Sequence, residues 1–204
     1  MEILYSSLIG YSLGCISPSA IISKVKHKNL REEGTGNLGA TNVTMVMGKG
    51  WGVFVMLFDI AKGAGAFLLA SLVFPSLSYA GLIAGLFAML GHIFPFYLRF
   101  RGGKGLATFA GTALAYNPLM FFILLAACMA VMFIANYSFV VPYSAAVLFC
   151  LCASLYSMDI CVLIITAIMG ILIVWKHFGN FRKAKDGEDI KVRDYIKNHI
   201  FNKN

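Results

Sequence analysis

Charged side chains are scarce in this sequence. Asp, Glu, Lys and Arg make up 13% of the 204 residues, whereas hydrophobic residues make up 59%. An ordinary soluble domain has about 25% charged residues, and a soluble protein of this size would not cover its surface with so few charges. Apolar stretches long enough for a membrane-spanning helix recur along the whole chain. The composition therefore excludes a soluble domain and predicts an all-α, polytopic membrane protein.

Signals for secretion, disulfide bonding and metal binding are also missing. The five cysteines all lie inside apolar runs and show no disulfide or metal-ligand spacing, so we interpret them as small hydrophobic residues and predict no metal site. The first apolar run follows Glu2 without a basic segment or a small-residue cleavage pattern, which indicates a retained span and not a signal peptide. No internal repeat or coiled-coil heptad is present.

The basic residues are unevenly distributed. Apolar runs cover 3–23, 51–74, 77–98, 106–135, 138–157 and 160–175. Three polar segments, 24–49, 99–104 and 176 to the end, hold all but one of the 17 Lys and Arg, the exception being Lys62. By the positive-inside rule these segments face the cytoplasm and the N-terminus lies outside. The net charge of +8 thus reflects membrane orientation, and we expect no nucleic-acid partner.

The run 106–135 decides the number of spans. As one straight helix it would be about 45 Å long, against a hydrocarbon core of about 30 Å. A break at the turn-favouring pair Asn117-Pro118 gives seven transmembrane helices and returns the C-terminus to the cytoplasm. The piece 106–116 is then short, and we expect it to be shallow or tilted. We predict a seven-helix domain over 1–180 and a cytoplasmic basic tail over 181–204.

The first basic segment contains a glycine-rich stretch, 31–42, with the sequence REEGTGNLGATN. Three glycines within six residues let a backbone bend sharply and expose N–H groups, and such a nest binds phosphate or another oxyanion when a helix follows it. A flexible turn between helices is the alternative. The candidate residues are Thr35 and Asn37, as catalytic groups, and Gly34, Gly36, Gly39, Thr41 and Asn42, as substrate or phosphate ligands.

A second glycine-rich stretch lies at the next membrane boundary, with GHIFP at 91–95 and FRGGKG at 100–105. Lys104 can donate to an anionic oxygen, while the glycines let backbone approach the ligand. The alternatives are a positive-inside anchor for the loop and a structural hydrogen-bond donor for His92. The candidate residues are His92 and Lys104, as catalytic groups, and Arg101, Gly102, Gly103 and Gly105, as phosphate ligands.

Two further pairs of polar residues lie within apolar runs or at their ends. Asp59 and Lys62 are three residues apart, on one face of a predicted helix, and we expect them to pair with each other because charges inside a membrane are costly. The pair has either a structural role or one in shaping the site. His177 and Asn180 lie one turn apart at the end of the last run, either as a water-facing helix end or as catalytic residues that close the same pocket.

At these residues the chain resembles the bacterial acyl-phosphate:glycerol-3-phosphate acyltransferases (PlsY-type). The resemblance covers almost the whole length. It rests on GTGNLGATN at 34–42, GHIFP at 91–95 and GGKG at 102–105, supported by Asp59-x-x-Lys62-Gly63 and His177-x-x-Asn180. It implies a seven-helix enzyme of the bacterial inner membrane, with its active site on the cytoplasmic face. Such an enzyme transfers a fatty acyl group from acyl phosphate to the 1-hydroxyl of glycerol 3-phosphate, without metal, coenzyme A or another cofactor.

The chain also departs from the family pattern. It has Thr35 where the family usually has Ser, Lys183 where it has Arg, and Gly187-Glu188-Asp189 where it has Gly-Thr-Glu. Ile16-Ser17-Pro18-Ser19 carries an extra residue compared with the usual Ile-Pro. The largest departure is Met45, where the family usually has an arginine. A small transporter of phosphorylated solutes and a noncatalytic lipid-binding paralogue are the alternative functions, and the oligomeric state and acyl-chain preference stay open.

Overall fold

The computed structural model describes residues 1–186 and 191–196, and every regular element within these ranges is a helix. The predicted all-α class is therefore confirmed. The chain forms two compact units, Met1–Pro118 and Leu119–Asn204, which are described separately. The prediction of one domain over 1–180 with a tail over 181–204 stays a prediction. The departure at Gly187-Glu188-Asp189 lies outside the described residues.

The described residues include six helical stretches that are long and apolar enough to cross a membrane. The apolar helix Leu106–Tyr116 is shorter. The chain breaks after this helix at Asn117, as the Asn117-Pro118 pair predicted, because the next helix begins at Pro118. The count of seven spans and the orientation in the membrane stay predictions. The six candidate spans are Glu2–Val25, Lys49–Val73, Ala80–Leu98, Pro118–Ala135, Val140–Ser157 and Ile160–Arg182.

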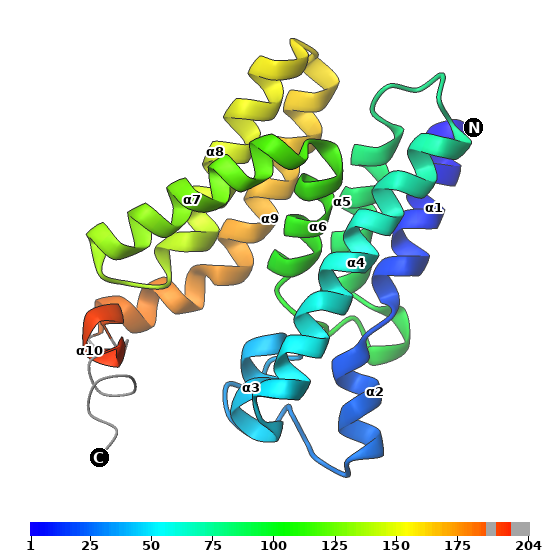
Figure 1. Cartoon of the computed structure of the whole chain (residues 1–204). Coiled ribbons are helices and arrows are strands. Elements are labelled where there is room, and N and C mark those ends of the chain that lie inside the picture. The colour runs from blue at the N-terminus through cyan, green and yellow to red at the C-terminus, as the bar shows by residue number, and fades with distance from the viewer. Residues whose placement is uncertain (187–190, 197–204) are drawn as a thin grey trace. The chain divides into compact units, whose positions relative to one another are not determined.

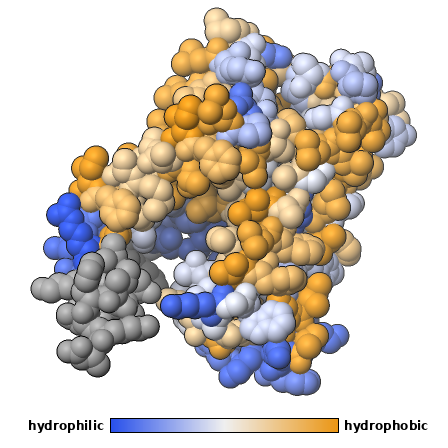
Figure 2. All heavy atoms as spheres, viewed as in Figure 1, coloured by the Kyte–Doolittle hydropathy of each residue, from blue (hydrophilic) through white to orange (hydrophobic). Residues whose placement is uncertain are grey.

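The first unit is a helical bundle that carries both glycine-rich stretches (Figure 1). Figure 2 shows apolar residues over its long helices and hydrophilic residues gathered at the end where α2 and α3 lie. This division matches a bundle whose sides face lipid and whose end faces water. The elements are α1 (Glu2–Cys15), α2 (Pro18–Val25), α3 (Ala40–Met47), α4 (Lys49–Val73), α5 (Ala80–Ile93), the 3₁₀ turn η1 (Phe96–Leu98) and α6 (Leu106–Tyr116).

Glycines bring the helices of this unit into backbone contact. A Cβ atom on Gly10 or Gly14 of α1 would collide with the backbone of Ala84 or Ala88 of α5. A Cβ atom on Gly63 of α4 would likewise collide with the backbone of α6. Because lipid is as apolar as leucine, close packing of small residues is a main source of helix association in membranes. These contacts build a rigid frame beneath the loops.

The first candidate span, which the sequence predicted as the apolar run 3–23, consists of two helices with a break between them. Helix α1 ends at Cys15, and α2 begins at Pro18 with Ser17 as its N-cap residue. The break leaves carbonyl groups without helical partners, and side chains from elsewhere bind them. The Tyr97 hydroxyl donates to the carbonyl oxygen of Cys15 at 2.7 Å, and Lys62 Nζ donates to that of Ile16 at 2.8 Å. Hydropathy alone does not reveal such a break.

The second unit contains α7 (Pro118–Ala135, whose first residue belongs to the first unit), α8 (Val140–Ser157), α9 (Ile160–Lys185) and α10 (Val192–Ile196). Helices α8 and α9 pack together, and the Tyr143 hydroxyl of α8 donates to the carbonyl oxygen of His177 at 2.9 Å. The backbone N–H groups of Val192 and Arg193 donate to Asn136 at 3.1 and 2.9 Å. The start of α10 therefore lies at the turn between α7 and α8.

Candidate active site

The first glycine-rich stretch is organised around the side chain of Asn42. This side chain is fully buried at the start of α3. Its amide nitrogen donates to the carbonyl oxygens of Leu30 and Glu33 at 2.8 and 3.1 Å, and its Oδ1 accepts from the backbone N–H of Thr35 at 2.6 Å. The same Oδ1 atom occupies the space that a side chain at Gly34 would need, and Gly34 has a φ of +62°. Asn42 thus fixes the path of the loop from inside.

The loop also has a small apolar core of its own. Leu30 and Leu38 point inward and are almost fully buried, and they pack with Ile22, Val43 and Val55. This packing ties the loop to α2, α3 and α4. Thr35, predicted as a catalytic group, and Thr41, predicted as a ligand, are both exposed. Helix α3 begins directly after Gly39, as the nest prediction requires.

The second glycine-rich stretch folds back onto the end of α5. The N–H groups of Gly102 and Gly103 donate to the carbonyl oxygens of Ile93 and His92 at 2.9 and 3.1 Å. A Cβ atom on either glycine would collide with His92, so only glycine fits here. Gly105 precedes α6 with a φ of +85°, a conformation that favours glycine. Lys104 is half-buried and lies between the buried residues Gly103 and Gly105.

The two glycine-rich stretches meet. A methyl group at Gly103 would lie 3.0 Å from the carbonyl oxygen of Leu38. The guanidinium group of Arg31 donates a hydrogen bond to the carbonyl oxygen of Arg101, which links the loops a second time. The candidate residues of both stretches therefore lie close together in the first unit. Sequence reasoning did not identify Arg31 as this link, because nothing in the sequence specified its partner.

A buried ionic centre lies behind this junction. Lys62 Nζ is 2.7 Å from Asp59 Oδ1, so the predicted pair is confirmed, and 2.9 Å from His92 Nδ1. The same Asp59 oxygen is 3.3 Å from His92 Nδ1. The three side chains are only 2% (Lys62), 3% (Asp59) and 7% (His92) exposed. The centre joins α4, α5 and, through the carbonyl oxygen of Ile16, the break between α1 and α2.

Ser19 also supports the site, and sequence reasoning missed it. Its buried hydroxyl donates to the carbonyl oxygen of Leu38 at 3.2 Å, so α2 holds the first loop where the second loop meets it. The signal was the sequence Ser17-Pro18-Ser19, in which a proline after a possible N-cap residue marks a new helix start.

The remaining predicted catalytic residues, His177 and Asn180, lie one turn apart on α9 of the second unit. His177 is buried, and its Nδ1 atom is 2.8 Å from the carbonyl oxygen of Ile173, one turn earlier on the same helix. Asn180 is half-buried. The prediction that both close the pocket formed by the loops stays a prediction.

Met45 lies on the outer face of α3. Its side chain is 66% exposed, and it follows Thr41 by one helical turn. It therefore lies beside a predicted phosphate ligand without contributing to the core. Substitution of this residue by a longer polar side chain requires no rearrangement of buried atoms.

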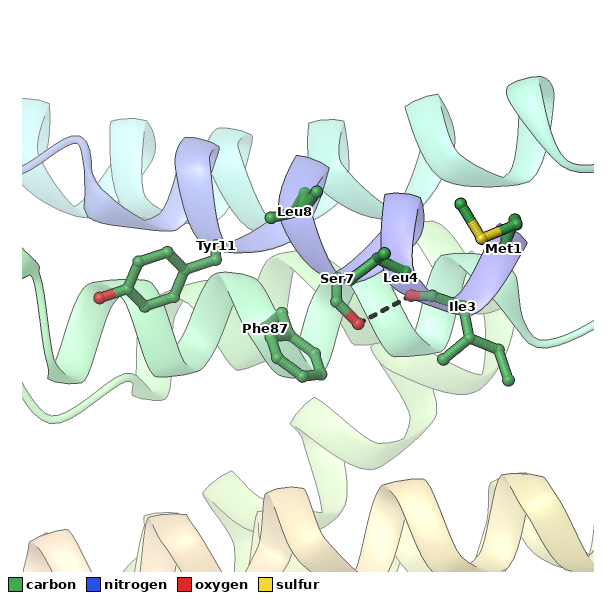
Figure 3. A pocket seen from close by; sticks show the side chains of 7 residues that line it. All are labelled: Met1, Ile3, Leu4, Ser7, Leu8, Tyr11 and Phe87. Atoms are coloured by element: carbon green, nitrogen blue, oxygen red, sulfur yellow. Dashed lines mark hydrogen bonds between the residues drawn. The ribbon is translucent and has the colours of Figure 1, made fainter.

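An apolar groove of about 510 Å³ runs along the N-terminal half of α1 beside α5 (Figure 3). The hydroxyl of Tyr11, at one end of the groove, donates to the carbonyl oxygen of Phe94 at 2.8 Å. Such a surface suits hydrocarbon and not a phosphate group. Its lining consists of Met1, Ile3, Leu4, Ser7, Leu8, Tyr11 and Phe87. Among the described residues, no three or more His, Cys, Asp or Glu side chains are grouped so that they could hold a metal ion.

Comparison with known proteins gives consistent matches over nearly the whole chain. Residues 4–187 match the family described as glycerol-3-phosphate acyltransferase. The glycerol-3-phosphate acyltransferases of Macrococcus caseolyticus and Listeria welshimeri are 34% and 36% identical to it, in alignments that cover 95% of this chain and 98% of theirs. The fold of this chain is similar to that of PlsY, an integral membrane glycerol 3-phosphate acyltransferase, in the glycerol 3-phosphate form. That match has a TM-score of 0.85 and 30% identity, and covers 94% of this chain and 96% of the other.

Proposed function

We propose, because this chain belongs to the glycerol-3-phosphate acyltransferase family, that it transfers a fatty acyl group from acyl phosphate to the 1-hydroxyl of glycerol 3-phosphate. The products are lysophosphatidic acid and inorganic phosphate. The observation that carries the proposal is the junction of the two glycine-rich loops, with Lys104 in the second loop two residues before α6. PlsY has been solved in a glycerol 3-phosphate form and in a lysophosphatidic acid form, which supports these two ligands for the shared fold.

The site suits two substrates that each carry phosphate. Exposed Thr35 and Thr41 offer hydroxyl donors, and Lys104 offers a cation. Glycines at 34, 36, 102, 103 and 105 let the two loops bend and pack closely against neighbouring groups, which holds these side chains near the loop junction. An ammonium group and hydroxyl groups that are already positioned bind an oxyanion without a large loss of side-chain freedom.

The reaction needs no covalent intermediate on the enzyme. The 1-hydroxyl oxygen of glycerol 3-phosphate attacks the carbonyl carbon of acyl phosphate, and the bond between that carbon and the phosphate oxygen breaks. The departing phosphate accepts the hydroxyl proton, so atoms and charges balance. The protein orients the two substrates and stabilises the negative charge that develops on the carbonyl oxygen. We assign this stabilisation to the predicted catalytic groups Thr35, Asn37, His92, Lys104, His177 and Asn180.

The setting in the membrane follows from the two kinds of substrate. The acyl chain is hydrophobic and enters from the bilayer, whereas glycerol 3-phosphate enters from the cytosol. With the N-terminus outside, both glycine-rich loops lie on the cytoplasmic face of the inner membrane. We assign the active site to that face because the basic residues beside both loops obey the positive-inside rule.

The transporter alternative has little support in the ionic centre. A transported anion needs a cation that is available near the middle of the membrane. Lys62 instead forms an ion pair with Asp59 and hydrogen bonds with His92 and the carbonyl oxygen of Ile16, so its charge is already balanced inside the protein.

The test uses the purified full-length chain with palmitoyl phosphate and glycerol 3-phosphate. We expect phosphate release that depends on glycerol 3-phosphate, together with formation of lysophosphatidic acid. Lys104→Ala should lower turnover at least about tenfold, whereas Lys26→Met, which also removes one loop cation, should not. Uptake of glycerol 3-phosphate into vesicles without acylation would favour a transporter. No turnover and no uptake would favour a noncatalytic relative.

A further inference from the structure

The contacts of Lys62 determine where the proton of His92 lies. Lys62 Nζ is 2.7 Å from Asp59 Oδ1, 2.8 Å from the carbonyl oxygen of Ile16 and 2.9 Å from His92 Nδ1. An ammonium group has three N–H bonds and no lone pair. A charged Lys62 therefore donates to the carbonyl oxygen of Ile16 and to His92 Nδ1, and its charge pairs with the carboxylate of Asp59.

The contact between the two nitrogens is the informative one. At 2.9 Å one nitrogen has to accept a hydrogen bond from the other, and a charged Lys62 can only donate. A neutral Lys62 would leave the carboxylate of Asp59, which is 3% exposed, with only the longer 3.3 Å contact to His92 Nδ1 in place of the 2.7 Å ion pair, and a buried charge without a close partner is costly. His92 Nδ1 is thus the acceptor, and a neutral imidazole then carries its proton on the other ring nitrogen, Nε2.

The Nε2 atom lies where the two loops meet. It occupies the space that a side chain at Gly103 would need, and the same position is 3.0 Å from the carbonyl oxygen of Leu38. A proton on Nε2 makes this edge of the ring a donor, whereas a proton on Nδ1 would make it an acceptor. The tautomer of His92 therefore sets the hydrogen-bonding character of the ring at the loop junction.

We propose that Asp59 and Lys62 are positioning residues that hold His92 in the Nε2–H tautomer, with the carbonyl oxygen of Ile16 at the helix break as the third partner of Lys62. This inference holds whatever reaction the site performs. Only its expected effect on turnover rests on the proposed acyl transfer. The break between α1 and α2 has a use in this arrangement, because an intact helix would have used the Ile16 carbonyl internally.

Nitrogen-15 NMR of the full-length protein in lipid nanodiscs, with labelled histidine, tests the tautomer directly. The chain has four histidines, and the signals that vanish in His92→Gln belong to His92. We expect an unprotonated Nδ1 and a protonated Nε2 in the wild-type protein. A His92 proton on Nδ1, or on both nitrogens, at neutral pH would overturn the proposal.

Variants of the pair test the cause. Lys62→Met should convert the His92 signals into those of mixed or reversed tautomers, whereas Lys26→Met should leave them unchanged. Lys62→Met leaves the buried carboxylate of Asp59 without its partner, which is strongly destabilising. The double variant Asp59→Leu/Lys62→Met removes both charges at once, and proteins often tolerate the replacement of a buried ion pair by hydrophobic residues. An unchanged Nε2–H tautomer in this folded double variant would show that the pair does not set it.

Turnover gives a second measurement that distinguishes positioning from a merely structural role. The amide nitrogen of glutamine can take the place of Nε2, whereas the shorter asparagine reaches only the place of Nδ1. We expect His92→Gln to keep a kcat on the order of tenfold above that of His92→Asn, and Lys62→Met to lower kcat on the order of tenfold with KM changed less than about twofold. Equal kcat for the two His92 variants would contradict a donor role for Nε2. A wild-type protein without turnover would refute the proposed function and leave the NMR result valid.

Discussion

Asn42 offers the sharpest test of how the first loop works, because it was predicted as a phosphate ligand and its side chain is fully buried with three hydrogen bonds to backbone groups. Asn42→Ala removes all three bonds. A typical intramolecular hydrogen bond contributes about 0.5–1.5 kcal/mol, so the loop should lose about 2–4 kcal/mol of local stability. We therefore expect the variant to fold with its helical frame intact and to lose most of its activity.

Asn42→Asp separates loop organisation from ligand binding. The carboxylate keeps an acceptor for the N–H of Thr35, but it faces the carbonyl oxygens of Leu30 and Glu33, where the amide nitrogen now donates. Two acceptors in contact repel each other, so this near-isosteric change should disturb the loop at least as much as Asn42→Ala.

The assay combines hydrogen exchange of the backbone amides over 29–39 with steady-state kinetics. Both variants should raise exchange in this loop and leave exchange in α4 and α5 near the wild-type level, since loops open locally. Asn29→Ala is the matched control, because exposed Asn29 lies in the same loop and its side chain accepts from the N–H of Arg31 at 3.2 Å. Protected amides in Asn42→Ala with lost activity would refute the organising role and favour direct contact with substrate.

Three further outcomes are expected. Lys104→Ala should lower kcat/KM by at least 10- to 100-fold at unchanged Tm, because a charged hydrogen bond contributes about 1.5–3 kcal/mol; a near wild-type rate would exclude Lys104 from the site. In a cysteine-free background, Asn117→Cys should react with an impermeant thiol reagent from outside and Lys185→Cys from the cytoplasmic side, and the reverse pattern would contradict the seven-span orientation. Gly14→Val, whose Cβ meets the backbone of Ala88, should lower stability in detergent by about 1–3 kcal/mol, whereas Gly65→Ala, with no atom within 4 Å of its Cβ, should not.

A further expected outcome concerns Met45, where this chain lacks the family's arginine. Its exposed position next to Thr41 leaves room for a guanidinium group, so Met45→Arg should raise kcat/KM for glycerol 3-phosphate by about 10- to 100-fold. Steady-state kinetics decide the matter. No gain, together with robust wild-type activity, would mean that another group holds that phosphate.

The sequence predicted the parts of the fold that depend on local chemistry. Long apolar runs identified the helices, the Asn117-Pro118 pair identified the break before α7, and the spacing of Asp59 and Lys62 identified an ion pair. Each of these signals depends only on residues that are close together in the sequence. The composition of the glycine-rich stretches likewise indicated loops, and ligand binding by these loops stays a prediction.

The arrangement of the site depended on contacts that no local pattern encodes. The partner of Lys62 at Ile16 is 46 residues away, and the link from Arg31 to Arg101 spans 70 residues. The packing role of the helix glycines is also not visible in the sequence. The backbone of α5 lies against Gly10 and Gly14 and leaves no space for a side chain there, which a single sequence does not reveal. The sequence predicted Asn42 as a ligand and did not show that its side chain points inward. That direction follows from the packing of α3 and not from the residue type.

The ionic centre is a poor candidate for stability alone. Moving two charges out of water is costly, and well-packed hydrophobic residues of similar volume often replace a buried pair at no loss of stability. Asp59 and Lys62 are nevertheless almost completely buried within an apolar helix, where hydrophobic substitutes would fit readily. What a hydrophobic pair could not do is donate to His92 Nδ1 and to the carbonyl oxygen of Ile16 from one atom. The reason for a charge at this depth is therefore directional: it fixes the hydrogen bonding of the imidazole that faces the loops.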